Sequence, residues 1–247
     1  MKRIFTSIIF YPVLFLFVLL SYFSHYQSYA EENFKGYVVC IDPGHQGKEN
    51  TNLEPIGPGS SQTKPSVSSG TRGKLAGTED AVNLDVGLRL REILTQKGVT
   101  VIMTRVTPDV NVPNSERASI ANRCKADLCI RLHCDAGAEH NCFTLYPALI
   151  KNWTDDIYDE SLKAAGIVQK AYSTYTNIPD KGLIPRSDLS GFNWSDVPVI
   201  LPEMLHMQNP EDDQKASTPE FRQKMAEGLA IGVFEYLKTA SHQKNKS

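Results

Sequence analysis

Two histidines and a glutamate occupy positions from which they can reach one metal ion. His45 and His133 each lie at the end of an apolar run that reads as a β-strand, and Glu79 opens an amphipathic helix. Two imidazoles and one carboxylate form a common ligand set for catalytic zinc, which keeps a fourth position open for water. His45, Glu79 and His133 are therefore predicted to bind Zn²⁺.

A second glutamate, Glu203, follows the apolar run 199–202. Zinc lowers the pKa of a bound water from about 15.7 to about 7 and polarises a carbonyl under attack. Amide hydrolysis also needs a group that takes a proton from water and gives one to the leaving nitrogen. A carboxyl in partly apolar surroundings can have its pKa tuned for both tasks. Glu203 is predicted to be this general base and acid.

Each of these residues also has a structural interpretation when it is taken alone. An acid in the first turn of a helix, such as Glu79, commonly does no more than stabilise the helix dipole. A histidine after Asp-Pro-Gly, such as His45, is equally a turn residue. The metal site is preferred because all four side chains are expected at one edge of the same sheet.

The elements that carry these residues alternate along the chain. Apolar, partly β-branched segments predict strands, and apolar residues at helical spacing predict helices. Strands are expected over 37–41, 99–104, 128–133 and 198–204. Helices are expected over 79–97 with Thr78 as N-cap, over 115–123 with Asn114 as N-cap, over 161–175, and from 218 to about 237. This order predicts a single α/β domain with a mostly parallel sheet covered on both faces, where ligands bind beyond the carboxyl ends of the strands.

The segment 46–78 shows neither a helical nor an alternating pattern. It is rich in Gly, Pro, Ser and Thr, which predicts a long loop of the kind that is often functional. Its length and glycine content make a lid over the site a hypothesis.

The first 30 residues are expected to be an export signal rather than part of the fold. Lys2 and Arg3 precede a long apolar stretch, and small residues precede Glu31, as in a cleavable signal peptide. The chain is therefore expected to be secreted, with membrane anchoring through residues 4–22 as the alternative. The catalytic domain is expected over 31–240, followed by a polar tail over 241–247.

Charge and cysteine content narrow the possible partners. The chain has 26 basic and 28 acidic residues and no long basic run, so a nucleic-acid partner is not expected. Five cysteines in an exported chain leave at least one unpaired within the molecule. Cys134 and Cys142 are close enough in sequence for a bridge, whereas Cys40 and Cys129 can simply be small buried apolar residues.

The motifs around the predicted ligands resemble the zinc-dependent N-acetylmuramoyl-L-alanine amidases of the amidase-3 family. The resemblance covers about residues 36 to 238. It rests on Ile-Asp-Pro-Gly-His at 41–45, Glu-Asp-Ala-Val-Asn-Leu at 79–84, Thr-Arg at 104–105, Glu-Arg-Ala-Ser-Ile-Ala-Asn at 116–122, Ile-Arg-Leu-His-Cys-Asp at 130–135, Val-Pro-Val-Ile-Leu-Pro-Glu at 197–203 and Asn-Pro-Glu-Asp at 209–212.

The resemblance implies a three-layer α/β/α domain around a mixed sheet of about six strands. It also implies hydrolysis of the amide between N-acetylmuramic acid and L-alanine in peptidoglycan, and it makes Arg186 a candidate for binding a stem-peptide carboxylate. The chain departs from the family after the glutamate, where Met204-Leu205-His206 replaces the commoner Gly-Phe. His206 is thus either an indirect supporter of the metal site or a surface residue.

Two other functions remain open on the sequence. The same fold can be a catalytically silent wall-binding or activator module, and the same chemistry can cut within the stem peptide. The occupied ligand positions favour the amidase. No repeated wall-binding module is evident, so targeting is expected from the catalytic domain, from a membrane anchor or from a protein activator.

Overall fold

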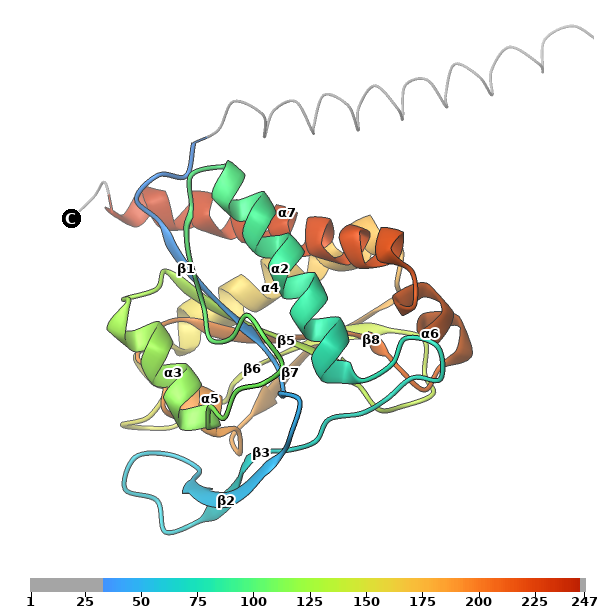
Figure 1. Ribbon diagram of the computed structural model, residues 1–247. Coiled ribbons are helices and arrows are strands. Elements are labelled where there is room, and N and C mark those ends of the chain that lie inside the picture. Colours follow the sequence, from blue (N-terminus) through green and yellow to red (C-terminus); the bar gives the residue numbers. More distant parts are fainter. Residues whose placement is uncertain (1–32, 245–247) are drawn as a thin grey trace, which may run out of the picture. The chain divides into compact units, whose positions relative to one another are not determined.

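The computed structural model describes residues 33–244 of the chain, and a six-stranded sheet forms its centre (Figure 1). The strand order is β4-β1-β5-β8-β6-β7. The strands are β1 at Val38–Pro43, β4 at Thr100–Met103, β5 at Leu128–Asp135, β6 at Cys142–Pro147, β7 at Asp180–Arg186 and β8 at Val199–His206. β4, β1, β5 and β8 run parallel, whereas β6 is antiparallel to β8 and parallel to β7. The predicted mixed sheet of six strands is confirmed.

Helices cover both faces of this sheet (Figure 1). On one face, α2 packs on β1, β4 and β5, α4 packs on β6, β7 and β8, and both contact α7. On the other face, α3 and α5 contact each other. The helices are α2 at Glu79–Gln96, α3 at Asn114–Arg123, α4 at Tyr158–Thr176, α5 at Ser190–Asn193, α6 at Pro210–Ala216 and α7 at Pro219–Lys244. These elements belong to one compact unit that begins at Phe34, and the predicted three-layer architecture is confirmed.

The central strands are buried on both faces, which explains why they are so apolar. Cys40, Cys129 and Val199 belong to the core cluster under α3 and α5. The residues that alternate with them, such as Val39 and Ile200, point to the opposite face and are also fully buried. Strands of this kind read as continuous apolar runs, and this signal identified them in the sequence.

The carboxyl ends of β1, β5 and β8 meet at one edge of the sheet. His45 follows β1, His133 lies near the end of β5, and Glu203 pairs directly with His133 in the β5–β8 register. Glu79 is the first residue of α2. The edge predicted to carry the four residues therefore does carry them.

The segment 46–78 is more ordered than the sequence predicted. It contains a hairpin of two antiparallel strands, β2 at Asn50–Pro55 and β3 at Thr63–Val67, which form a separate small sheet. The expectation of a long structureless loop is wrong for this part. The strand sequences Asn-Thr-Asn-Leu-Glu-Pro and Thr-Lys-Pro-Ser-Val contain few apolar residues and two prolines, so no apolar alternation marks the strands.

Further elements differ from the expectations. The strands β6 and β7 were not predicted, and α7 continues to Lys244, past the expected end near Leu237. Asn114 is the first helical residue of α3 and not its N-cap, which is Pro113. The Asn114 side chain instead donates to the Ser66 carbonyl at 2.6 Å and accepts from Nη2 of Arg131 at 2.6 Å. The Asn114 side chain therefore bonds to residues far away in the sequence and does not cap α3.

The sequence also made predictions about the cysteines and the amino-terminal segment. All five thiols are free, so the bridge considered between Cys134 and Cys142 is wrong. The predicted signal or anchor at 1–30 lies outside the described residues. Among the helices within 33–244, none combines the length and the apolar character that crossing a membrane requires.

Candidate metal centre

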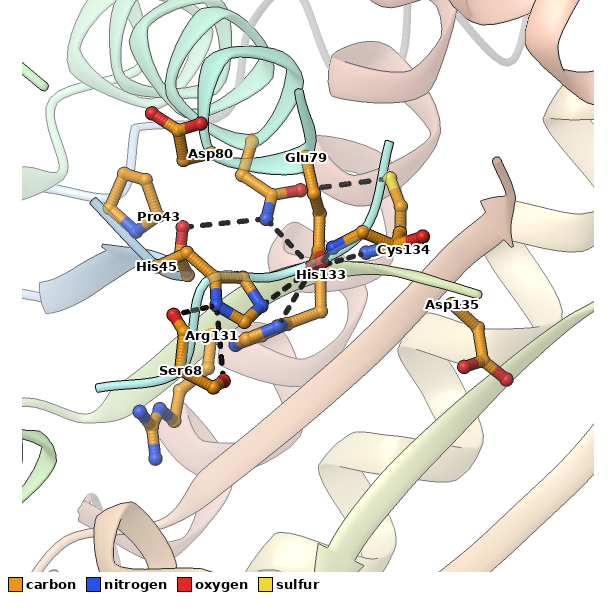
Figure 2. Close-up of polar contacts among 12 residues, drawn as sticks. Pro43, His45, Ser68, Glu79, Asp80, Arg131, His133, Cys134 and Asp135 are labelled. Atoms are coloured by element: carbon orange, nitrogen blue, oxygen red, sulfur yellow. Dashed lines mark hydrogen bonds and ion pairs between the residues drawn. The ribbon is translucent and has the colours of Figure 1, made fainter. Parts of the chain in front are cut away.

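The two histidines converge on one carboxylate oxygen of Glu79. His45 Nε2 and His133 Nδ1 each lie 3.0 Å from Glu79 Oε1, and the two rings meet edge to face with centroids 4.7 Å apart. Figure 2 shows both rings turned toward the Glu79 carboxylate. Within residues 33–244, this is the group of histidine, cysteine and acidic side chains with three ligand atoms within 4.8 Å of one another. The three predicted ligands can thus hold one metal ion.

The approach of His133 requires a glycine in the turn that follows β1. A Cβ atom on Gly44 would lie 2.3 Å from Nε2 of His133, a distance that real atoms do not tolerate. His133 therefore packs its Nε2 side against the backbone of Gly44 and presents Nδ1 to the metal centre. The glycine of the Asp-Pro-Gly-His motif is needed for close approach.

His45 adopts a left-handed backbone conformation with φ of 60°. Such a conformation costs a residue with a side chain about 1 kcal/mol or more and persists where surrounding contacts enforce it. The Nη2 group of Arg117 donates to the His45 carbonyl at 2.9 Å. Arg105 donates from Nη2 to the Gly44 carbonyl at 3.0 Å and from Nε to the Pro43 carbonyl at 2.8 Å. Two buried guanidinium groups thus fix the turn that presents His45.

Arg117 and a further buried arginine, Arg131, are anchored by Asp42, the last acidic residue before the turn. Its carboxylate binds Nη1 of Arg117 at 2.7 Å and Nε of Arg131 at 2.8 Å, and accepts from the hydroxyl of Thr104 at 2.5 Å. Burial alone would raise the pKa of Asp42, but the charges of Arg117 and Arg131 outweigh burial and hold this pKa well below its ordinary value. Asp42 therefore stays ionised inside the protein.

The imidazole of His45 is held in the tautomer that a metal needs. Its Nδ1 donates to the Ser68 carbonyl at 2.8 Å (Figure 2), which leaves the lone pair of Nε2 facing Glu79. For His133, burial lowers the pKa of the ring despite the opposing effect of Glu79. Burial would raise the pKa of Glu79, but its bonds with both histidines lower it well below the ordinary value. The set thus favours neutral His133 and ionised Glu79, the ligand forms that bind metal.

Three donors orient the Glu79 carboxylate. The backbone N–H of Thr71 donates to Oε2 at 2.9 Å, and the N–H of Cys134 and the side-chain amide of Asn83 donate to Oε1 at 3.1 and 3.2 Å. Asn83 lies one helical turn after Glu79 in α2, whereas Thr71 and Cys134 are brought to the carboxylate by the fold and were not identified from the sequence. Together the three donors hold the Glu79 carboxylate in one orientation.

Glu203 lies on the strand next to His133, and its Oε2 is buried without a hydrogen-bond partner among the described residues. Burial and the negative charges of Glu79 and Asp135 raise the pKa of Glu203 well above its ordinary value, and Arg186 opposes this effect. A carboxyl with a raised pKa and a free oxygen can hold a proton and release it.

Arg186 is not part of the cluster of ligands. It lies at the end of β7 and forms a bidentate ion pair with Asp188, with Nε to Oδ1 at 2.8 Å and Nη2 to Oδ2 at 2.7 Å. The pair leaves the Nη1 group of Arg186 outside these two bonds. Binding of a substrate carboxylate by Arg186 stays a prediction.

A cavity of about 210 Å³ opens beside the two histidines. Its lining mixes cationic, polar and apolar side chains, namely His45, Lys64, Pro65, Val67, Ser68, Asn114, Arg131, His133, Leu189 and Leu201. Lys64 and Arg131 are the functional candidates that sequence reasoning missed. Lys64 belongs to the unpredicted hairpin, and Arg131 stands inside an otherwise apolar strand, a signal that could have drawn attention to it.

The hairpin forms a wall of this cavity and is fastened to the domain. The indole N–H of Trp194 donates to the Pro55 carbonyl at 3.0 Å, and that of Trp153 donates to the Pro58 carbonyl at 3.1 Å. Oε2 of Glu54 accepts from the backbone N–H of Ser115 at 3.0 Å. The segment therefore borders the groove as an attached wall. The hypothesis of a moving lid stays untested.

The sequence and the fold match known amidases. Residues 39–235 match the amidase-3 family model, described as N-acetylmuramoyl-L-alanine amidase. The chain is 34% identical over 219 residues to an N-acetylmuramoyl-L-alanine amidase of Mycobacterium tuberculosis, which covers 84% of this chain and 89% of the relative. It is 25% identical to an uncharacterized cell wall amidase of Bacillus anthracis, covering 86% of this chain but 38% of the longer relative.

Solved structures give the same result. The crystal structure of an N-acetylmuramyl-L-alanine amidase from Mycobacterium smegmatis has a TM-score of 0.77 and 30% identity, and the match covers 84% of this chain and all of the other, 100%. An N-acetylmuramoyl-L-alanine amidase from Clostridium difficile has a TM-score of 0.64 and 25% identity, covering 82% and 97% of the two chains. With the family match over residues 39–235, these findings show that the chain belongs to the amidase-3 family of N-acetylmuramoyl-L-alanine amidases.

Proposed function

We propose that the chain hydrolyses the amide between the lactyl carbonyl of N-acetylmuramic acid and the amine of L-alanine in peptidoglycan. The observation that carries the proposal is the convergence of His45, Glu79 and His133 at one sheet edge with Glu203 paired opposite His133. The named activity of the M. tuberculosis relative, which this chain matches over most of both sequences, supports the same bond.

Zinc is the metal that these ligands suit best. Two neutral imidazoles and a carboxylate are a frequent zinc set, and the Ser68 carbonyl already orients His45 for it. A zinc ion held by His45, Glu79 and His133 would lower the pKa of a water molecule and polarise the amide carbonyl. The site thus fits the cofactor of the family.

Glu203 would handle the protons of the reaction. Its Oε2 has no hydrogen-bond partner within residues 33–244 and lies among groups that raise its pKa, so Oε2 can take a proton from the attacking water and deliver it to the leaving nitrogen. Delivery of that proton is essential because an unprotonated amide nitrogen does not leave. We assign both steps to Glu203.

The cavity beside the histidines would receive the substrate. Lys64 and Arg131 give it positive charge, and Leu189 and Leu201 give it apolar surface. This mixture suits a peptide stem that carries a carboxylate, and Arg186 at the end of β7 is a further candidate for binding it.

Two alternatives use the same features differently. A catalytically silent wall-binding module would leave the ligands and Glu203 without a task, and their joint retention argues against it. A zinc peptidase would cut within the stem peptide with the same chemistry but a groove that excludes the sugar.

The deciding experiment digests purified peptidoglycan with the zinc-loaded chain and identifies the products by mass spectrometry. The amidase releases intact stem peptides with free L-alanine amino termini and leaves glycan strands whose lactyl groups end in free carboxylates. Stem fragments that begin after the first residue would establish the peptidase instead. Binding without any product would establish the silent module.

The chain is proposed to act outside the cytoplasm, as the signal-like segment 1–30 suggests. Secretion is the first proposal, and anchoring through residues 4–22 is the alternative. A protein activator is also proposed, because one neighbour of the same fold, an amidase from Clostridioides difficile with a TM-score of 0.61 and 18% identity, was solved in complex with the GerS lipoprotein.

A further inference from the structure

The backbone that leads into Glu79 packs directly against the metal centre. In this segment, residues 70–78 and called the 70–78 loop below, Thr71 exchanges two hydrogen bonds with Glu79. The N–H of Thr71 donates to Glu79 Oε2 at 2.9 Å, and the N–H of Glu79 donates to the Thr71 carbonyl at 3.0 Å. A Cβ atom on Gly70 would lie 2.9 Å from Glu79 Oε2 and 3.0 Å from Cδ2 of His45. The loop therefore contacts two of the three ligands.

The beginning of α2 is hydrogen bonded to this loop and is not capped by a side chain. Thr78 is the N-cap residue, as predicted, but its side chain makes no capping hydrogen bond. The first N–H groups of a helix need partners outside the helix, and the Thr71 carbonyl supplies one for Glu79. In α6, by contrast, the side chain of Asn209 accepts from two N–H groups of the first turn. The position of Glu79, the first residue of α2, thus depends on the loop.

One buried carboxylate holds the far end of the loop. Asp213 of α6, which is 5% exposed, accepts from the backbone N–H groups of residues 74–76 at 2.9–3.1 Å. Figure 1 shows the loop reaching α6 before it returns to the start of α2. Successive N–H groups that point to one place form a binding site for an anion, and here the anion is a side chain of the same protein. A Cβ atom on Gly73 would lie 2.0 Å from Asp213 Oδ1, so the backbone passes very close to the carboxylate.

Apolar burial contributes little at this end of the loop. Leu75, its large apolar residue, is 59% exposed, and Ala76 is buried but contributes only a methyl group. Arg222 of α7 adds one hydrogen bond, from Nη2 to the Ala76 carbonyl at 3.0 Å. The tip of the loop is therefore held chiefly by charged side chains, and Asp213 makes most of the bonds.

The loop is closed on itself, so its tip and its base move together. The N–H of Gly73 donates to the Gly77 carbonyl at 3.0 Å, and Arg72 and Thr78 form an antiparallel bridge. The two residues that flank this bridge, 71 and 79, are the pair that exchanges two hydrogen bonds at the metal centre. A change at the tip is therefore carried through paired backbone to the ligand.

We propose that Asp213 is a positioning residue for the metal centre. Its carboxylate fixes the tip of the loop, and the loop fixes Thr71. Thr71 in turn holds the carboxylate of Glu79 toward the two histidines. Groups that orient a metal ligand through hydrogen bonds change the metal affinity when they are removed. This role rests on the proposed binding of zinc by His45, Glu79 and His133.

The test measures zinc affinity by competition with a chelator, on the purified full-length chain. In Asp213→Asn, one oxygen acceptor is replaced by an N–H₂ group that faces backbone N–H groups, so the tip of the loop is released. We expect zinc to bind about tenfold more weakly than in the wild type, the lower end of the range for groups that orient ligands. The readout does not require hydrolysis.

Asp212→Asn is the matched control, because Asp212 is also buried in α6 but binds other parts of the fold. Its Oδ2 accepts from the backbone N–H of His206 at 3.1 Å, and its Oδ1 binds Nδ1 of His140 at 2.7 Å. His206 is itself 1% exposed, with Nε2 3.0 Å from Oδ1 of Asn141, so the surface position that the sequence left open for it is wrong. Asp212→Asn should lower stability and leave zinc affinity unchanged.

Cobalt(II) in place of zinc gives a readout that loss of stability alone does not change. Co²⁺ accepts the same types of ligand as zinc, and the visible absorption of bound Co²⁺ depends on the geometry of its ligands. We expect the absorption bands of Asp213→Asn to differ from those of the wild type, and those of Asp212→Asn to match them. Urea unfolding of the same samples establishes that each variant is folded.

Gly73→Ala disturbs the same contact from the side of the loop, because its Cβ would meet Asp213 Oδ1 at 2.0 Å. It should weaken zinc binding and change the cobalt spectrum as Asp213→Asn does. If Asp213→Asn does not fold, Gly73→Ala decides alone, and wild-type zinc affinity in that variant would overturn the proposal.

The remaining outcomes separate this role from the metal centre itself. Wild-type zinc affinity and a wild-type cobalt spectrum in Asp213→Asn would overturn the role of Asp213 and leave the metal centre intact. Equal losses in Asp213→Asn and Asp212→Asn would also overturn it, because they would reflect general destabilisation. A wild-type chain that binds no zinc would refute the proposed metal centre, and the role of Asp213 with it.

Discussion

The end of β1 and the turn that follows it (residues 42–45, called the turn below) and the β2–β3 hairpin both border the groove, but they are held by different interactions. The turn is fixed by buried charge: the guanidinium groups of Arg105 and Arg117 bind the backbone that presents His45, and the carboxylate of Asp42 pairs with Arg117. The hairpin is held mainly by side chains of the domain that hydrogen bond to its backbone, such as Trp194 to the Pro55 carbonyl. The comparison teaches that the chemistry is built on parts that tolerate little change, whereas the wall of the groove tolerates more.

The largest effects on activity are expected from substitutions at the metal centre that the turn helps to form. His133→Ala should lose both zinc and activity, because it removes a ligand. Glu203→Gln should keep zinc and lose about 10²- to 10⁴-fold in kcat, because it removes only the proton carrier. Metal content and turnover measured on the same samples check this, and full activity in Glu203→Gln would refute the assigned role.

The next largest effect concerns Gly44. Gly44→Ala places a carbon 2.3 Å from Nε2 of His133, so the imidazole must leave the position from which Nδ1 faces the metal centre. We expect at least about a tenfold loss in zinc affinity, as for changes that disturb ligand orientation, with a parallel loss in activity. A competition titration with a zinc chelator measures the affinity, and unchanged binding would show that His133 is not confined as described.

Asp42→Asn tests the buried charges of the turn. Removing one partner from a buried ion pair costs about 3–5 kcal/mol of unfolding free energy, and here Arg117 and Arg131 would both lose their anion. Urea unfolding measures the loss. Glu116→Gln, at an exposed pair with Arg123 whose side chains are 48% and 62% exposed, is the control and should change stability by less than about 1 kcal/mol. Equal effects of the two substitutions would contradict the contrast.

The same aspartate gives a pH dependence with a definite sign. Because the folded-state pKa of Asp42 is depressed, its contribution to stability is complete above the ordinary aspartate pKa of about 3.9. The contribution is lost progressively as the pH falls below that value toward the lower folded-state pKa. Acid unfolding of the Asp42→Asn variant should therefore depend less on pH in this range than that of the wild type.

Smaller effects are expected on the hairpin side. Lys64→Met removes a cation from the groove but no metal ligand, so KM for peptidoglycan fragments should rise about three- to tenfold, as for one lost polar contact, while kcat and zinc content stay near wild type. Steady-state kinetics on soluble fragments check this. A fall in kcat with KM unchanged would place Lys64 in the chemistry instead.

The smallest effect is expected in the turn of the hairpin. Gly59 has φ of 72°, and no atom of the described part of the chain lies within 4 Å of the position of a Cβ. Gly59→Ala should therefore cost only the backbone strain, about 1 kcal/mol, and leave kcat unchanged. A loss of activity in this variant would mean that the hairpin is coupled more tightly to the metal centre than its contacts indicate.

The same contrast explains what the sequence predicted. His45, Glu79, His133 and Glu203 were located because each follows a strongly apolar strand or opens a periodic helix, and parallel strands bring their ends together. The hairpin carries no such pattern. The β3 sequence Thr-Lys-Pro-Ser-Val has no alternation of apolar and polar residues, and Pro65 is unusual inside a strand. The strands of the hairpin pair with each other and not with the central sheet, and of their apolar residues Val67 is buried whereas Leu53 is 67% exposed.

Hydrogen bonds between side chains that are far apart in the chain could not be predicted from the sequence either. Asparagine is a residue type that often caps helices, but Asn114 bonds to Arg131 and Ser66 because tertiary contacts outweigh the local preference. His206 has no local pattern that separates a buried residue from a surface one. In both cases the deciding neighbour lies 17 or more positions away.

The position of the hairpin in the chain has a practical consequence for handling the protein. A protease that nicks the exposed turn near Gly59 would put His45 on one fragment and Glu79 with His133 on the other. β1 is paired with β4 on one side and with β5 on the other, so the two fragments would remain one particle. A preparation that runs as two bands on a denaturing gel can thus still be folded and fully loaded with metal.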